Sequence, residues 1–131
     1  MGNFFTASLL LCMLHQSQLV NSFYSSIRVP AQVIKDKDNH AHAVVFFGSH
    51  ACRACKYVYP QYLTLAEQCS NSTAFYAINV DGDREGLNYA QSLQIKALPT
   101  VAIYTQGNDT AMTMPCGPKH FRGFVRRIRE L

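Results

Sequence analysis

Cys52 and Cys55, two cysteines separated by two residues, are the pair whose type and spacing best suit chemistry in this chain. The apolar run Val44–Phe47 before them predicts a buried strand that ends at Gly48, and the residues after Cys52 have helical periodicity. Cys52 is therefore predicted at a helix N-terminus, where unpaired backbone N–H groups and the helix dipole stabilise a thiolate. We expect Cys52 to be the nucleophile and Cys55, one turn further along, to resolve the mixed disulfide formed at Cys52.

The residues after this pair predict further alternation of helices and strands. The helix that starts at Cys52 is expected to continue to about Gln68 and to be kinked at Pro60, which lacks a backbone N–H. A second strand is predicted over residues 74–80, and strand, helix, strand in this order implies parallel pairing through a right-handed crossover. The helix after it carries three apolar residues at helical spacing: Leu87, Ala90 and Leu93.

The C-terminal part of the chain predicts a hairpin and a final helix. Residues 100–104 and 111–114 have strand composition and are separated by a polar turn that contains Gly107. The final helix is expected to bury one apolar face and to expose its arginines to solvent. The residues of that apolar face are Phe121, Phe124, Val125, Ile128 and Leu131.

The order of these motifs resembles the thioredoxin family. Lys56 follows the second cysteine, Pro60 lies five residues after that cysteine, and Asn79-Val80-Asp81 is similar to the end of the family's next strand. Leu98-Pro99-Thr100 is similar to the family's cis-proline loop, and the turn after the following strand also matches. The resemblance covers about residues 43–131 and implies an α/β thioredoxin fold, with a central mixed sheet of four to five strands flanked by helices.

The resemblance also implies an activity, that of a thiol:disulfide oxidoreductase and in particular a protein-disulfide reductase in redox homeostasis or regulation. It implies a cis peptide bond before Pro99, and a tight turn before a strand is where such bonds occur. In the family this loop lies against the two cysteines and offers backbone hydrogen bonds to an extended substrate segment. The substrate-binding residues expected on this basis are Leu98, Pro99, Arg53, Ala54 and Pro115. The expected partners are protein disulfides and an upstream thiol reductase of unknown type, without a cofactor, and the protein is expected to be a monomer.

Several positions depart from the family pattern. Ala51 stands in place of the tryptophan before the first cysteine, and Arg53-Ala54 replaces the Gly-Pro between the cysteines. Phe46 replaces a buried acid and Ala77 replaces the lysine that accompanies it, so neither charge is left buried alone. Because Cys55 thereby loses its usual proton acceptor, slower general disulfide reduction is expected. The varied dipeptide and the extra cysteines are similar to those of atypical plastid-type thioredoxins.

Four further side chains are candidates for roles near the pair. His50 and Arg53 could place positive charge beside the thiolate of Cys52. Cys116 falls where the family has a small-residue loop beside the active-site cysteines. We hypothesise that Cys116 lies near Cys52 on the substrate-facing surface and forms a regulatory or resolving disulfide, the alternative being an unreactive loop thiol. Cys69 is expected on the buried side of the first helix, as a small hydrophobic residue.

Two functions of other classes stay open at this point. A non-catalytic thioredoxin-like module could hold an extended peptide in the cleft around Pro99, although the intact cysteine pair argues against it. A zinc-binding domain could combine Cys52 and Cys55 with Cys116 and His120, which stand at C-x3-H spacing. Against zinc, Pro99 is expected beside the thiols and supplies no ligand.

The composition sets limits on both size and partners. The chain has 131 residues, of which 48% are hydrophobic and 15% charged, enough for one globular domain with a single core. The formal net charge of +4 comes without a long basic run or an aromatic-interleaved basic stripe, so nucleic-acid binding is not expected. Five cysteines are too few for a disulfide scaffold and suit a redox site.

Residues 1–22 are predicted to be a cleaved signal or targeting segment. Phe4–Leu14 is an apolar run too short to span a bilayer but suited to the core of a signal peptide, and Val20-Asn21-Ser22 offers a cleavage site. An uncleaved anchor or an ordinary buried helix stays open, because no Lys or Arg precedes the run. Residues 23–42 are expected to hold the rest of a presequence and an abbreviated first βα unit.

Phe23, directly after that cleavage site, is similar to the start of the bipartite presequences of algae with secondary plastids. We therefore expect entry into the secretory route and delivery to such a plastid, with no membrane span in the mature form. The alternative destinations are the lumen of the endoplasmic reticulum and the extracellular space.

Overall fold

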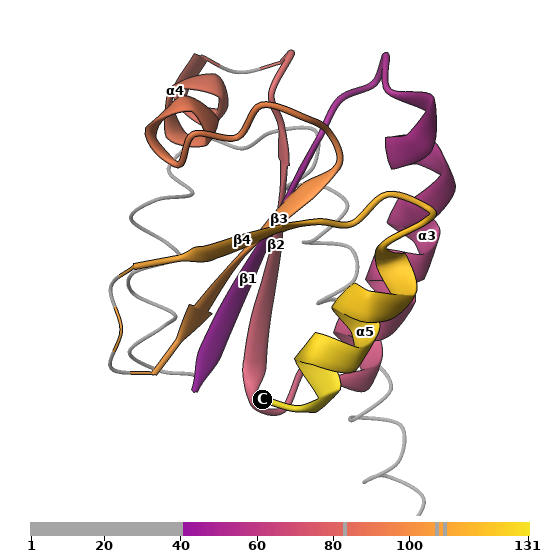
Figure 1. Cartoon of the computed structure of the whole chain (residues 1–131), viewed down its shortest axis with the longest axis vertical. Coiled ribbons are helices and arrows are strands. Elements are labelled where there is room, and N and C mark those ends of the chain that lie inside the picture. Colours follow the sequence, from indigo (N-terminus) through magenta and orange to yellow (C-terminus); the bar gives the residue numbers. More distant parts are fainter. Residues whose placement is uncertain (1–40, 83, 107, 109) are drawn as a thin grey trace, which may run out of the picture.

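The computed structural model describes residues 41–82, 84–106, 108 and 110–131 (Figure 1). The predictions for the signal segment 1–22, for residues 23–40 and for Gly107 lie outside the described residues. The elements in chain order are β1 (His42–Gly48), α3 (Arg53–Gln68), β2 (Thr73–Asn79), α4 (Arg84–Ser92), β3 (Thr100–Thr105), β4 (Met112–Pro115) and α5 (Phe121–Arg129).

The strand that precedes the cysteines, β1, is an inner strand of a four-stranded sheet with the order β2-β1-β3-β4. It pairs parallel with β2 and antiparallel with β3, and β3 pairs antiparallel with β4. Val44–Phe47 are apolar at every position, as a strand that is covered on both faces requires. The predicted mixed sheet, the parallel crossover and the C-terminal hairpin are confirmed.

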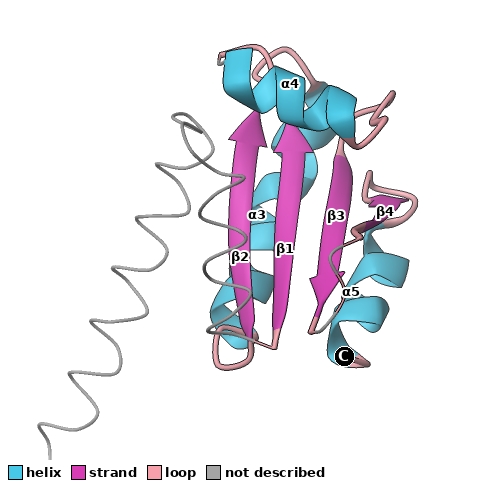
Figure 2. Cartoon of the chain, turned by 90° about the vertical axis from the view of Figure 1, so that its left-hand side faces the viewer, coloured by secondary structure: helices cyan, strands magenta, loops and turns pink. Residues whose placement is uncertain are grey.

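The side chains of the inner strands alternate between two cores, because successive residues of a strand point to opposite faces. One core lies under α3 and α5 and includes Phe46 of β1, whereas the other includes Phe47 and is completed by Ala90 of α4. Figure 1 shows α3 and α5 on the same side of the sheet and α4 on the other. Figure 2 shows α4 across the end of the sheet at which β1 and β2 finish.

The helix α3 supplies most of the helical part of the first core. Tyr62 of α3 is fully buried, and its hydroxyl donates to the carbonyl of Tyr76 in β2 at 2.6 Å. The carbonyl of Val44 in β1 is a second, longer acceptor at 3.4 Å. Pro60 lies within the helix, on its exposed side. The predicted end at Gln68 is confirmed, and half-buried Cys69 follows as the C-cap and packs against this core.

The predicted buried face agrees with the structure in α5 but only in part in α4. In α5, Phe121, Phe124 and Ile128 are buried and the arginines are exposed, as predicted. In α4 the buried residues are Gly86 and Ala90, four positions apart, whereas Leu87 is 41% exposed. Leu93 lies beyond the end of α4 and is half-buried. None of the helices in the described part of the chain is both long enough and apolar enough to cross a membrane.

Candidate active site

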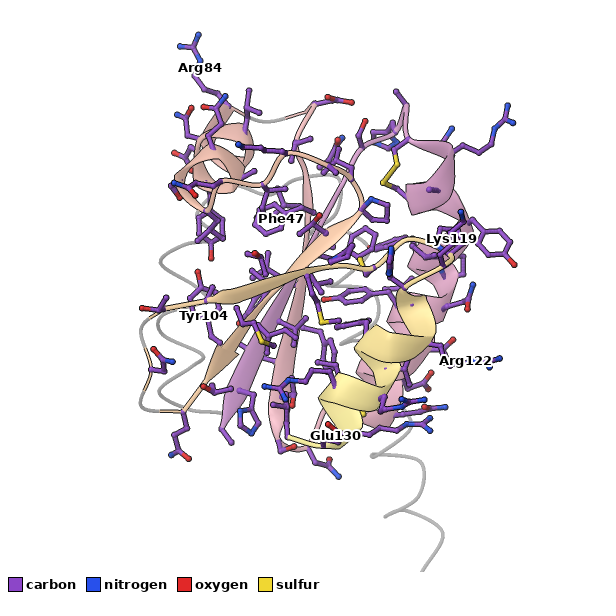
Figure 3. The ribbon with its side chains drawn as sticks, viewed as in Figure 1. Phe47, Arg84, Tyr104, Lys119, Arg122 and Glu130 are labelled. Atoms are coloured by element: carbon purple, nitrogen blue, oxygen red, sulfur yellow. A yellow bond between two sulfur atoms is a disulfide. The ribbon has the colours of Figure 1, made fainter. Side chains whose placement is uncertain are left out.

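Cys52 and Cys55 are joined by a disulfide at the start of α3, with their Cα atoms 5.2 Å apart (Figure 3). Cys52 is the N-cap of the helix and has an extended backbone conformation. Its Sγ accepts a hydrogen bond from the backbone N–H of Cys55 at 3.1 Å, and its carbonyl accepts from the N–H of Lys56 at 3.2 Å. A sulfur atom therefore occupies the position at which a helix favours negative charge.

The two cysteines differ in their exposure to solvent. Cys52 is half-buried, whereas Cys55 exposes none of its surface and belongs to the core under α3. The first turn of α3, which the structure describes in full, has no acidic residue that would oppose a thiolate. An incoming disulfide can reach the sulfur of Cys52, and Cys55 can react only with the sulfur beside it.

The loop before β3 has the predicted cis-proline. The peptide bond between Leu98 and Pro99 is cis, and Pro99 is buried. The carbonyl of Pro99 accepts a hydrogen bond from the backbone N–H of Cys116 at 3.2 Å. Leu98 and Cys52 both pack, half-buried, against the core that contains Cys116. The structure thus brings the cysteine pair, the proline loop and the end of β4 together, as the sequence predicts.

Cys116 lies in the core against which Cys52 packs, but it is not exposed as the sequence hypothesis required. Its side chain exposes no surface, so the expectation of a thiol on the substrate-facing surface is wrong. Burial raises the pKa of this thiol to about 12, because an apolar environment disfavours the thiolate. The protonated, enclosed thiol matches the alternative interpretation, that of an unreactive residue.

The remaining predicted site residues lie around the pair with different exposures. Arg53 in the first turn of α3, His50 before it and Pro115 at the end of β4 are exposed, and Ala54 is half-buried. Their exposure is compatible with contact to a substrate, and their roles stay predictions.

The core that contains Cys55 is apolar at the two positions where the family pattern has a buried acid and a lysine. Phe46 and Ala77 are both fully buried and are register partners on β1 and β2. The ring of Phe46 lies 4.9 Å from that of Tyr62 and 5.5 Å from that of Tyr59, centroid to centroid. Aromatic packing thus surrounds Phe46 in the core to which Cys55 also belongs.

Ser49 and Asp81 are site residues that the sequence reasoning missed. Ser49 is 4% exposed, and its hydroxyl donates to the carboxylate of Asp81 while accepting from the backbone N–H of Ala51 at 3.1 Å. Its carbonyl accepts from the N–H of Cys52 at 3.2 Å. The turn that carries Cys52 is therefore tied to the segment after β2.

A signal for this link was present in the sequence. Gly48 and Asn79 are register partners at the ends of the parallel strands β1 and β2, so the residues that follow them are neighbours. A serine one residue after β1 and an aspartate two residues after the adjacent parallel strand β2 are therefore candidates to meet at the carboxyl edge of the sheet. The side chain of Asn79 supports the arrangement by accepting from the N–H of Asp81 at 3.1 Å.

The zinc ligand set is not assembled. Among the residues that the structure describes, no three His, Cys, Asp or Glu side chains are grouped so that they could hold a metal ion. Cys116 is enclosed in the core, whereas His120 is exposed at the N-cap of α5. The four candidate ligands Cys52, Cys55, Cys116 and His120 therefore do not form one site.

A mixed sheet, a disulfide-bonded cysteine pair at the start of a helix and a cis-proline loop beside it together define the class of thioredoxin-fold proteins. Residues 30–128 match the thioredoxin family model, and the chain belongs to the thioredoxin family.

Relatives from fungi and algae agree with this assignment. The chain is 35% identical over 75 residues to thioredoxin AMT13 of Alternaria alternata, a match that covers 57% of this chain and 60% of that protein. It is 31% identical over 77 residues to the H-type thioredoxin of Chlamydomonas reinhardtii, covering 59% of this chain and 66% of that protein. The match thus spans somewhat less than two thirds of the length of these relatives.

Solved structures show the same fold. Thioredoxin O2 of Arabidopsis thaliana in its oxidised state has a TM-score of 0.63 at 17% identity, with 79% of this chain and 89% of that chain covered. Thioredoxin f2 of Chlamydomonas reinhardtii has a TM-score of 0.58 at 25% identity, with 70% of this chain and 79% of that chain covered.

Proposed function

We propose that this protein is a thiol:disulfide oxidoreductase that reduces disulfides of other proteins. One observation carries the proposal. Cys52 is half-buried, and its sulfur caps α3 by accepting a hydrogen bond from the backbone N–H of Cys55. The same sulfur forms a disulfide with the buried Cys55. This arrangement leaves one sulfur accessible to a substrate and places a second sulfur where it can resolve the mixed disulfide.

The reaction starts from the reduced pair. The thiolate of Cys52 attacks one sulfur of the substrate disulfide, forming a mixed disulfide and releasing the other substrate sulfur, which takes up a proton. The thiolate of Cys55 then attacks the sulfur of Cys52, forming the Cys52–Cys55 disulfide and releasing the second substrate thiol. The substrate gains two electrons and two protons, and an upstream thiol reductase must return the same number to the protein.

The second step needs a proton acceptor for Cys55. Phe46 and Ala77 are apolar and offer none, so the proton must pass to water or to the departing substrate sulfur. We infer that resolution of the mixed disulfide is slower than in a thioredoxin with a buried carboxylate. The backbone carbonyls and N–H groups of the Pro99 loop would align an extended substrate segment beside Cys52.

Reduction of insulin disulfides with dithiothreitol as electron donor tests the activity. We expect turbidity from precipitated insulin B chain with the wild type and none above background with Cys52→Ser. When insulin is added to the prereduced Cys55→Ser variant without dithiothreitol, we expect a mixed disulfide to accumulate. The Cys69→Ser variant is the matched control and should retain the wild-type rate. Absence of reduction, together with retained binding of an extended peptide, would instead support a peptide-binding module.

The reduction potential of the pair decides the direction of electron flow. Titration with glutathione, with Cys69 and Cys116 replaced by serine, gives this value. A potential near about −270 mV supports a reductase, and one near about −180 mV supports an oxidant or isomerase.

We also propose that the N-terminal segment delivers the protein through the secretory route to a plastid. The support is sequence alone, namely the apolar run Phe4–Leu14 and Phe23 after the cleavage site. A fluorescent protein fused behind residues 1–42 should reach the plastid, and removal of residues 1–22 should leave it in the cytosol. Retention in the endoplasmic reticulum or secretion would contradict the plastid proposal.

A further inference from the structure

A groove runs between α3 and α5. It consists of two adjacent hollows of about 380 and 270 Å³ that share Gln61, Phe121 and Val125. We call it the α3–α5 groove. Its floor and walls are formed by Tyr57, Gln61, Thr64, Leu65 and Gln68 of α3, Pro118 before α5, and Phe121, Arg122, Val125 and Arg129 of α5.

One end of the groove is formed by residues that lie close in sequence to Cys55 and Cys116. Tyr57 is two residues after Cys55 on the same helix, and Pro118 is two residues after Cys116, whose N–H holds the Pro99 loop. The α3 residues of the groove recur at helical spacing from Tyr57 to Gln68 and so form one continuous wall. The eleven helical rises from Tyr57 to Gln68 span about 16 Å, the length of about five residues of extended chain.

Its walls combine apolar surface with positive charge. Tyr57 is 65% exposed, the largest exposed fraction among the big hydrophobic side chains of the described residues. Arg122 and Arg129 are exposed, and no carboxylate is among the described residues that line the two hollows. Exposed aromatic and arginine side chains are the types that contribute most binding energy at protein interfaces.

The two arginines are placed to read charge along a bound segment. Arg122 and Arg129 lie seven residues apart on α5, which corresponds to about 10 Å along the helix axis. The guanidinium of Arg129 is 3.4 Å from the side-chain oxygen of Gln68 across the groove, so it is held at the far end from the cysteines. Arg122 lies near the other end, beside Tyr57 and Pro118. Guanidinium groups bind carboxylates through paired hydrogen bonds.

We propose that the α3–α5 groove binds an acidic, partly apolar segment of the disulfide-bearing protein that reacts at Cys52. This inference rests on the proposed reductase function for the identity of the partner. The apolar residues of the segment pack on Tyr57, Phe121 and Val125, and its carboxylates pair with Arg122 and Arg129. Docking there raises the local concentration of the substrate disulfide at Cys52 and selects acidic partners over neutral ones.

The test measures binding apart from redox chemistry. The probe is a fluorescein-labelled peptide that contains Glu-Leu-Glu-Leu-Glu and no cysteine, titrated with the oxidised full chain and followed by fluorescence anisotropy. The matched probe replaces each Glu by Gln. At low salt we expect the acidic peptide to bind at least about fivefold more tightly than the neutral one, with the difference lost at about 0.5 M salt because exposed charges are screened.

Variants locate the binding to the groove. Arg122→Gln and Arg129→Gln should each weaken binding of the acidic peptide by about fivefold, and Tyr57→Ala should weaken binding of both peptides. Arg84→Gln is the matched control, because Arg84 lies on α4, away from α3 and α5 (Figure 3), and should bind as the wild type does. Equal binding of the two peptides, or equal loss in all three arginine variants, overturns the proposal.

A second arm links the groove to catalysis. Two substrate peptides carry the same disulfide loop joined by a short glycine linker to the acidic or the neutral sequence. We expect a higher kcat/KM for the acidic substrate, abolished by Arg122→Gln with Arg129→Gln, and unchanged reduction of bis(2-hydroxyethyl) disulfide. Binding without any reduction would contradict the reductase function alone, whereas reduction without a preference for the acidic substrate would contradict the groove proposal alone.

Discussion

Phe46 and Ala77 meet as register partners across the parallel strands β1 and β2, and neither exposes any surface. Both side chains are apolar, at two positions where the family pattern has an acid and a lysine. A single apolar replacement would have left one charge without a partner in the core. With both positions apolar, no unpaired charge is buried in this part of the core.

Phe46→Asp should be strongly destabilising. The new carboxylate would lie among the rings of Tyr59 and Tyr62 without a partner, at a cost of at least about 3 kcal/mol in the free energy of unfolding at pH 7. Phe46→Leu is the control and should cost about 1 to 2 kcal/mol through lost packing. Urea unfolding of the oxidised proteins measures both values.

Acidification distinguishes charge from lost volume in this pair of variants. A buried carboxyl has a raised pKa in the folded state, so the stability of the Asp variant should be greatest at low pH and fall as pH rises. Phe46→Leu should not show this dependence relative to the wild type. Equal losses in both variants at pH 4 and pH 7 would contradict the argument.

Ser49→Ala should loosen the turn that carries Cys52. The substitution removes the donor to Asp81 and the acceptor for the N–H of Ala51, which predicts a loss of about 1 to 2 kcal/mol. The rate of insulin reduction should fall several-fold, because the sulfur of Cys52 is held less firmly at the helix start. Ser92→Ala, which removes an exposed hydroxyl that bonds only within α4, serves as the control and should change neither value.

Tyr62→Phe isolates the contribution of one buried hydroxyl. It leaves the carbonyl of Tyr76 without the 2.6 Å hydrogen bond from α3, so the free energy of unfolding should fall by about 1 to 2 kcal/mol. Tyr57→Phe makes the same chemical change at a side chain that is 65% exposed and should change stability by less than about 0.5 kcal/mol. Chemical denaturation compares the two, and similar losses would be inconsistent with the role assigned to Tyr62.

The buried thiol of Cys116 should make the protein less stable in alkali. Its pKa is raised to about 12 in the folded state from 9.0, so the unfolded chain releases the proton first and gains stability as pH rises. The free energy of unfolding should therefore decrease above about pH 9, by about 1.4 kcal/mol for each unit of pH from this group.

Comparison with Cys116→Ala identifies the group responsible, because buried Tyr62 also has a raised pKa through desolvation. The variant should lose less stability than the wild type between pH 9 and pH 10.5. In the native reduced protein at pH 8, iodoacetamide should label Cys52 and leave Cys116 unmodified, as mass spectrometry of peptides can establish. Parallel pH curves for the two proteins would refute the assignment.

The elements near the cysteines were predictable because their signals are local. A short, unbroken apolar run that ends at Gly48 is typical of a strand covered on both sides, and the following periodicity ends at about Gln68, where α3 also ends. The cis bond before Pro99 followed from the family resemblance and is present. For α4 the choice of face was not predictable from Leu87, because two small residues, Gly86 and Ala90, allow closer packing on the sheet.

The parts of the site that escaped prediction depend on contacts between distant segments. Cys116 follows an edge strand whose side chains are largely exposed, so strand alternation gave no indication that the next residue turns inward. The link between Ser49 and Asp81 joins residues 32 positions apart and exists only once β1 and β2 are paired. Spacing within one segment cannot specify either of these contacts.

The sulfur of Cys52 both caps α3 and reacts in the proposed chemistry. In the reduced protein the sulfur of Cys52 can bear the negative charge that satisfies the N–H of Cys55, whereas in a mixed disulfide that charge is gone. Each turnover of the proposed reaction would therefore change the strength of this hydrogen bond, so we expect the first turn of α3 to be most stable in the reduced protein.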